Sequence, residues 1–80
     1  MAMNIDGKRL ARKMGANIRK YREQRGMSQL QLACAALLEQ RDVYLYEKGM
    51  MMPQMLRLVR IADALGVSLD ALAGRERYDK

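Results

Sequence analysis

The sequence predicts a compact all-α domain of five helices. Apolar residues recur every three or four positions in the longer segments, as on the buried face of a helix. Capping residues and glycines interrupt the chain at short intervals, and no segment alternates as a half-buried strand does. Eighty residues, half of them apolar, provide for one small core and no second domain. We therefore expect one domain over residues 1–80, with its core over about 7–73 and a frayed tail over 74–80.

The first helix is expected over about residues 7–25. Its apolar residues keep helical spacing: Leu10, Met14, Ile18 and Tyr21. Gly26 suits the position just after the last helical turn. Gly15 lies inside this segment and weakens a helix by about 1 kcal/mol relative to alanine. The first helix is therefore expected to bend near Gly15 or to begin late.

Two short helices are expected next. Ser28 followed by Gln31 forms a capping box, in which each residue bonds the backbone N–H of the other, so the second helix should cover about 29–36. The third should cover about 40–47, with Val43 and Tyr46 inward and Gly49 ending it.

Two further helices complete the chain. Pro53 suits the first turn of the fourth helix, where its missing N–H costs nothing. The buried side of that helix should be formed by Met55, Leu58, Ile61, Ala62 and Leu65. Gly66 ends it, and Ser68 caps a fifth, short helix that returns Leu69 and Leu72 to the core.

The positive charge is concentrated at the N-terminal end. The chain carries a net +6, and residues 1–27 hold eight Lys or Arg against two acids. Residues 28–53 carry −1 and residues 54–80 carry +1. A basic excess indicates nucleic acid as a partner. A solvated helix face accounts equally well for the basic run, and composition alone leaves both explanations open.

Enzymatic, metal-dependent and membrane-spanning functions are not expected. The chain has no His, one cysteine (Cys34), two serines that serve as caps and no Gly-rich phosphate loop, so no catalytic set, metal set or cofactor site can be assembled. No apolar run reaches the length of a membrane span. We expect a soluble protein, which would be cytoplasmic if natural.

Four segments carry a family resemblance. They follow one another at fixed spacing over about residues 17–73: IRKYREQRGMSQLQLA, VYLYEKG, Pro53 and LVRIADALGVSLDAL. With them the chain resembles the lambda-repressor-like, Cro/Xre helix-turn-helix domain. The resemblance implies five helices, of which the second and third form the helix-turn-helix. It also implies a third helix that enters the DNA major groove, usually in a two-fold dimer.

The resemblance also assigns roles to residues. Gln29 would open the second helix and touch the DNA backbone, Lys48 and the residues after Gly49 would approach phosphates, and Glu47 would pair with Arg22. The base-facing positions would be Gln40, Arg41, Tyr44 and Leu45.

This chain departs from the family pattern around the third helix. Leu37 stands where the turn usually has a glycine in the left-handed conformation, at a cost of roughly 1–2 kcal/mol. Glu39 replaces the usual Ser or Thr cap, and Asp42 adds a second acid to the reading helix. With only Arg41 and Lys48 opposing these acids, the electrostatic attraction for phosphate is expected to be nearly cancelled.

Apolar residues also stand at positions where the family is usually polar or basic. Met50 and Met51 follow Gly49, and Leu30 and Leu56 occupy further positions of this kind. Contiguous exposed apolar surface marks interaction sites, and Met and Tyr are common at protein interfaces. Intact scaffold positions beside replaced recognition positions are what a grafted binding surface would look like.

The main functional prediction is therefore a non-enzymatic protein-binding module, designed on an Xre-like scaffold, for a partner with an apolar patch. The predicted partner-binding residues are Leu30, Leu37, Glu39, Gln40, Arg41, Asp42, Tyr44, Leu45, Lys48, Met50, Met51 and Leu56. The alternative is a sequence-specific DNA-binding transcriptional regulator that uses Gln29, Gln40, Arg41, Tyr44 and Lys48. A homodimer is compatible with both functions.

Overall fold

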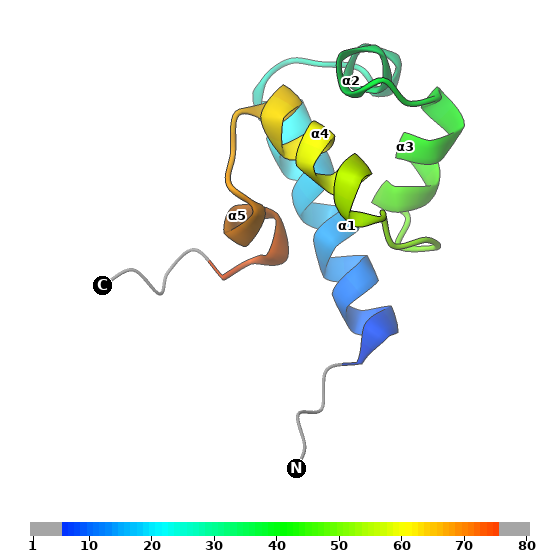
Figure 1. The fold of residues 1–80 in the computed structure, drawn as a ribbon, viewed down its shortest axis with the longest axis vertical. Helices are drawn as coiled ribbons and strands as arrows, with labels where there is room; N and C mark the ends of the chain where they lie inside the picture. Colours follow the sequence, from blue (N-terminus) through cyan, green and yellow to red (C-terminus); the bar gives the residue numbers. More distant parts are fainter. Residues whose placement is uncertain (1–5, 76–80) are drawn as a thin grey trace.

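The computed structural model describes residues 6–75, and all regular structure within them is helical. The helices are α1 (Gly7–Gln24), α2 (Gln29–Ala36), α3 (Gln40–Glu47), α4 (Met55–Leu65) and α5 (Leu69–Ala73). The long α1 lies behind α4, α2 and α3 follow one another along one side, and α5 packs on the other (Figure 1). The predicted all-α, five-helix fold is confirmed.

Helix ends follow the predicted capping residues. The Ser28 hydroxyl accepts a hydrogen bond from the Gln31 N–H at 3.0 Å, and the Gln31 side chain accepts one from the Ser28 N–H at 2.8 Å. The Ser68 hydroxyl caps α5 by accepting a hydrogen bond from the Ala71 N–H at 2.9 Å, without a reciprocal bond because residue 71 is alanine. Pro53 differs from the prediction, since α4 begins at Met55 with Gln54 as its N-cap, so the proline precedes the first turn.

Every helix contributes to the core. One fully buried side chain from each helix illustrates this: Ile18, Leu32, Val43, Ile61 and Leu72. The core therefore fixes the position of the short α3 from several directions, which its own eight residues could not do alone.

Gly15 allows α1 and α3 to touch through their backbones. A Cβ at this position would overlap the Tyr46 carbonyl oxygen and lie 2.9 Å from the Glu47 carbonyl oxygen. The expected late start of α1 was wrong, because α1 begins at Gly7 and is continuous through Gly15. The glycine is explained by this close approach of two helices.

Leu37 adopts the left-handed conformation that the family's glycine usually has at this position, with φ 60° and ψ 45°. It is the one non-glycine residue of positive φ within residues 6–75. Its side chain is 73% exposed, whereas the neighbouring Leu38 packs against the core. The turn between α2 and α3 is therefore built without its usual glycine and contains local backbone strain.

Candidate nucleic-acid interface

A buried ion pair joins α3 to α1. The Arg22 guanidinium contacts both carboxylate oxygens of Glu47, at 2.6 Å from Nε and 3.0 Å from Nη2. The two side chains are only 11% and 4% exposed. Arg22 also donates to the Met27 carbonyl oxygen at 2.8 Å, and its bond to Glu47 raises the arginine's pKa further. The pairing predicted from the family resemblance is present.

Gln29 joins the same network from the first position of α2. Its Nε2 donates to Glu47 Oε1 at 3.1 Å. Glu47 therefore links α1, α2 and α3, and the side-chain amide predicted to touch the DNA backbone is also engaged inside the protein.

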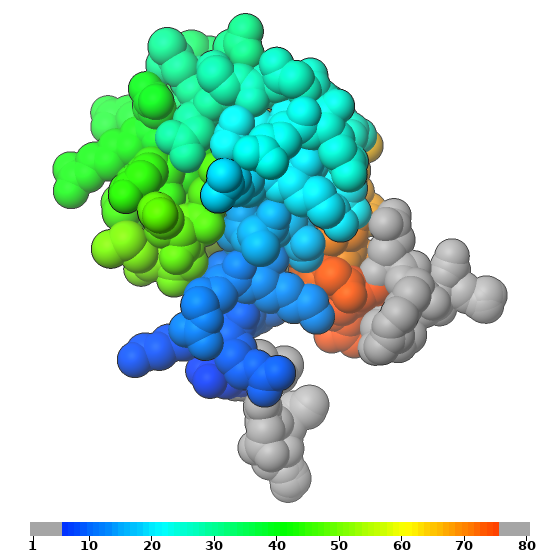
Figure 2. Space-filling model, turned by 180° about the vertical axis from the view of Figure 1, so that it is seen from behind, coloured from blue at the N-terminus to red at the C-terminus, as the bar shows by residue number. Residues whose placement is uncertain are grey.

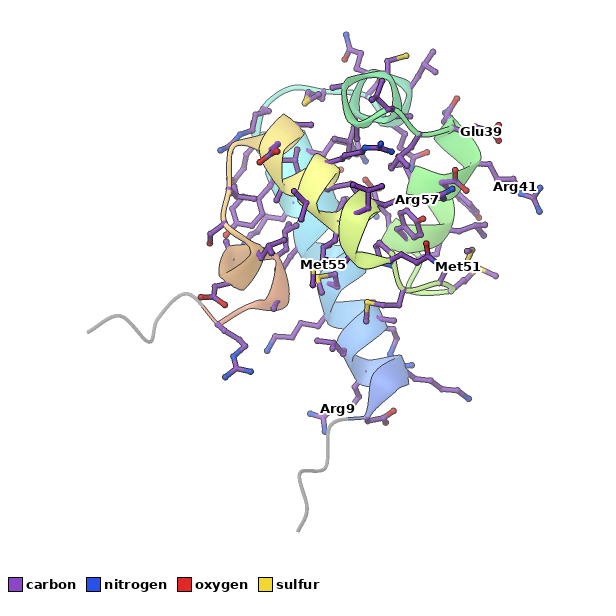
Figure 3. The ribbon with its side chains drawn as sticks, in the orientation of Figure 1. Arg9, Glu39, Arg41, Met51, Met55 and Arg57 are labelled. Carbon is purple, nitrogen blue, oxygen red and sulfur yellow. The ribbon has the colours of Figure 1, made fainter. Side chains whose placement is uncertain are left out.

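The opposite side of α3 faces solvent. Val43 and Tyr46 are buried, while Gln40, Arg41 and Tyr44 are exposed. Figure 3 shows Arg41 extending away from the body of the molecule. A helix with one fixed side and one side of extended polar and aromatic groups can enter a groove without losing core contacts.

Two more predicted residues lie on this side of α3. Lys48 is exposed, and its Nζ lies 5.8 Å from the centre of the Tyr44 ring. Leu45 is half-buried, so its side chain offers a partner less exposed surface than is expected of a partner-binding residue.

The charge assigned to Asp42 needs correction. Its carboxylate lies 3.4 Å from Arg57 Nη1, which also donates to the Tyr46 hydroxyl at 3.0 Å, and Figure 3 shows Arg57 reaching from α4 toward α3. The same carboxylate accepts from the Glu39 N–H at 3.4 Å. Asp42 is thus partnered by a cation from another helix, so the expected cancellation of positive charge on α3 was overstated.

Glu39 remains the exposed acid at the start of α3, beside Asp42 and on the same side of the molecule as Arg41 (Figure 3). A carboxylate there stabilises the helix dipole. It also opposes the approach of a phosphate to this helix end.

The predicted apolar residues are exposed but come from several parts of the fold. Leu30 lies on α2, Leu37 in the turn, Met50 and Met51 in the loop after α3, and Leu56 on α4. Their exposed fractions range from 43% to 73%. These side chains are available to a partner.

A hollow of about 220 Å³ lies where the first three helices meet. Its lining comprises Arg19, Arg22, Gln29, Tyr44, Glu47 and Lys48. The sequence predicted Gln29, Tyr44 and Lys48 as DNA contacts and Arg22 with Glu47 as a pair, but it did not predict Arg19 as a contributor. Arg19 lies three positions before Arg22 and so on the same side of α1, which is the pattern that predicts its approach to α3.

Residues 6–75 hold no group of three or more potential metal ligands. Within the same range, every helix is too short or too polar to cross a membrane.

Comparison with known proteins identifies the fold family. The family described as Helix-turn-helix matches residues 18–72. No curated protein matches the chain. The restriction-modification controller protein C.AhdI from Aeromonas hydrophila is 27% identical with a TM-score of 0.75, over 78% of this chain and 94% of that one.

Two further solved structures are similar. The hypothetical transcription factor NHTF from Neisseria is 28% identical with a TM-score of 0.79, over 96% of this chain and 91% of that chain. The competence regulator ComR from Streptococcus vestibularis is 30% identical with a TM-score of 0.75, over 89% of this chain and 23% of that chain. These comparisons give no support to an engineered origin. With the family matched over residues 18–72 and all five helices in place, the chain belongs to the helix-turn-helix family of the lambda-repressor-like, Cro/Xre type.

Proposed function

We propose that the protein is a sequence-specific DNA-binding transcriptional regulator whose α3 enters the major groove. The observation that carries this proposal is the two-sided construction of α3. Glu47, Val43 and Tyr46 hold one side in the core and in the ion-pair network. Gln40, Arg41 and Tyr44 extend from the other side into solvent, where they would contact base edges.

The charge distribution supports this proposal. Asp42 is paired with Arg57 at 3.4 Å, so among the described residues Glu39 is the unpaired acid opposing Arg41 on α3 and Lys48 just after it. Arg19 and Lys48 both line the hollow between the helices, and Arg19 forms an exposed ion pair with Glu23 at 3.1 Å, so within residues 6–75 Lys48 is the unpaired cation of the two. Cations at the edges of a groove-reading helix supply the sequence-independent part of DNA affinity.

Selection of bound duplexes from a randomised pool tests the proposal. We expect a specific sequence to be enriched, and we expect Arg41→Ala to lose about tenfold or more in affinity for it, as the loss of a bidentate base contact does. Arg9→Ala removes the same charge from a residue that points away from α3 (Figure 3) and serves as the control. Failure to enrich any sequence, with no duplex retained at low salt, would refute the proposal.

The exposed apolar side chains favour a second candidate function, the binding of another protein, including a second copy of this chain. Leu37, Met50 and Leu56 are each at least 60% exposed, and burial of apolar area favours association. The comparisons give no support to a designed binder or to an apolar-patch partner, so this function ranks below DNA binding. Light scattering after size exclusion, on the wild type and on a double change of Met50 and Met51 to Ser, tests self-association. A monomer at all concentrations would exclude the second copy.

A further inference from the structure

Helix α1 begins well before the segment that defines the family. The family match starts at residue 18, whereas α1 starts at Gly7. The first turns of α1 project beyond the other helices (Figures 1 and 2). They carry four cations: Lys8, Arg9, Arg12 and Lys13. The single acid at this end, Asp6, accepts a hydrogen bond from the Lys8 backbone N–H as the helix cap.

One side of this projecting segment lies against the loop that follows α3. A Cβ added to Gly49 would lie 2.7 Å from Arg12 Cγ and 2.8 Å from Arg12 Cα. Lys8 is one turn before Arg12, and Gly15, which touches α3, is close to one turn after it. Lys8 and Arg12 therefore continue the side of α1 that faces α3 and its loop.

The other two cations lie elsewhere. Arg9 points away from α3 (Figure 3). Lys13 faces the end of α5, because a Cβ at Gly74 would lie 2.5 Å from Lys13 Cε. The first turns of α1 thus hold two pairs of cations, each spaced by four residues. Lys8 and Arg12 lie on the side that faces α3 and its loop, and Arg9 and Lys13 lie elsewhere on the helix.

The pair beside the loop is available to a partner. Lys8 and Arg12 are exposed, and within residues 6–75 neither side chain forms an ion pair. The loop itself offers only the uncharged Met50 and Met51 next to Lys48. The Cα and Cγ of Arg12 therefore lie directly against the loop that follows the proposed reading helix, and its cationic side chain is exposed beside that loop.

We propose that Lys8 and Arg12 form an extension of the DNA interface that contacts backbone phosphates beyond the loop after α3. This inference rests on the proposed function, since it takes α3 as the helix that meets DNA. The acceptors are phosphates, so the contacts add affinity and salt dependence without a preference for base sequence. The protein would cover a longer stretch of backbone than the family segment alone.

Salt titrations of duplex binding test this extension. The probe is a random-sequence duplex of about 30 base pairs, with the dissociation constant measured by fluorescence anisotropy from about 50 to about 200 mM salt. The test variant is Lys8→Ala with Arg12→Ala. The matched control is Arg9→Ala with Lys13→Ala, which has the same net charge and the same two alanines in the same turns.

Two phosphate contacts contribute roughly 1.8 to the slope of log affinity against log salt. Over that salt range, the wild type is expected to lose about 12-fold more affinity than the Lys8/Arg12 variant. The control is expected to keep a slope close to that of the wild type. Circular dichroism of both variants checks that α1 remains folded.

Three results separate the possible failures. Equal slopes for the wild type and the Lys8/Arg12 variant would overturn the extension and leave the proposed function standing. An equal reduction in both double variants would also overturn it, because general charge and not position would then be responsible. No duplex binding by the wild type would remove the proposed function itself.

Discussion

The strained residue between α2 and α3 leads to a prediction about glycine. Glycine in place of alanine should stabilise the fold at position 37 and destabilise it at position 35. Leu37 holds φ 60°, whereas the exposed Ala35 lies two residues earlier within α2. Changing alanine to glycine inside a helix costs about 1 kcal/mol. At a left-handed position the same change relieves the contact between Cβ and the carbonyl oxygen that costs roughly 1–2 kcal/mol.

The comparison is made between Leu37→Gly and Leu37→Ala, so that the lost leucine contacts cancel. Leu37 is 73% exposed, so its truncation to alanine removes only about 0.5 kcal/mol of apolar burial. Glycine at position 37 relieves the backbone strain that alanine would keep. This gain in stability is reduced by roughly 0.5–1 kcal/mol, because glycine loses more conformational entropy on folding. We expect Leu37→Gly to be more stable than Leu37→Ala by about 0.5–1 kcal/mol.

Thermal and urea unfolding, followed by far-ultraviolet circular dichroism, measure these differences. The Tm of Leu37→Gly should exceed that of Leu37→Ala by roughly 2–8 °C, because 1 kcal/mol corresponds to about 4–8 °C in a domain of this size. Ala35→Gly should lower the wild-type Tm by a similar amount. A Leu37→Gly protein no more stable than Leu37→Ala would refute the assignment of strain to this turn.

Two other changes test the contacts that hold α3 in place. Glu47→Ala should lower the free energy of unfolding in urea by about 3 kcal/mol, because it leaves the Arg22 charge buried without its partner. As the control, Glu23→Ala breaks an exposed pair with Arg19 and should lower it by about 0.5 kcal/mol or less. Gly15→Ala should destabilise the fold by about 2 kcal/mol, since the new Cβ overlaps the Tyr46 carbonyl. Gly7→Ala, at a site with open space around it, should be neutral or stabilising, and equal effects of the two glycine changes would contradict the proposed contact.

The helices were predictable because their determinants are local. Ser28 with Gln31, and Ser68, fix helix starts through hydrogen bonds within three residues, and apolar spacing identifies the buried faces. The ion pair of Arg22 with Glu47 is not local, and it was predicted only through the family resemblance.

Pairings without such a precedent were missed. Asp42 was read as a free acid because its partner, Arg57, lies on another helix, and no local spacing connects the two. Gly15 was read as a weak point in α1 because the backbone contact with α3 spans about thirty residues of chain. The placement of Arg12 against Gly49 depends on that same helix crossing, which sequence spacing does not reveal.

The division of α3 into two sides separates the residues needed for folding from those proposed to contact DNA. Val43, Tyr46 and Glu47 are committed to the interior, and a change at any of them is felt by the whole domain. Arg41, Tyr44 and Lys48 are bound by no such requirement. If α3 reads DNA as proposed, substitutions at these three positions would alter the recognised sequence while stability stays nearly constant, so the target of this domain could diverge in evolution, or be reassigned in the laboratory, without a change of fold.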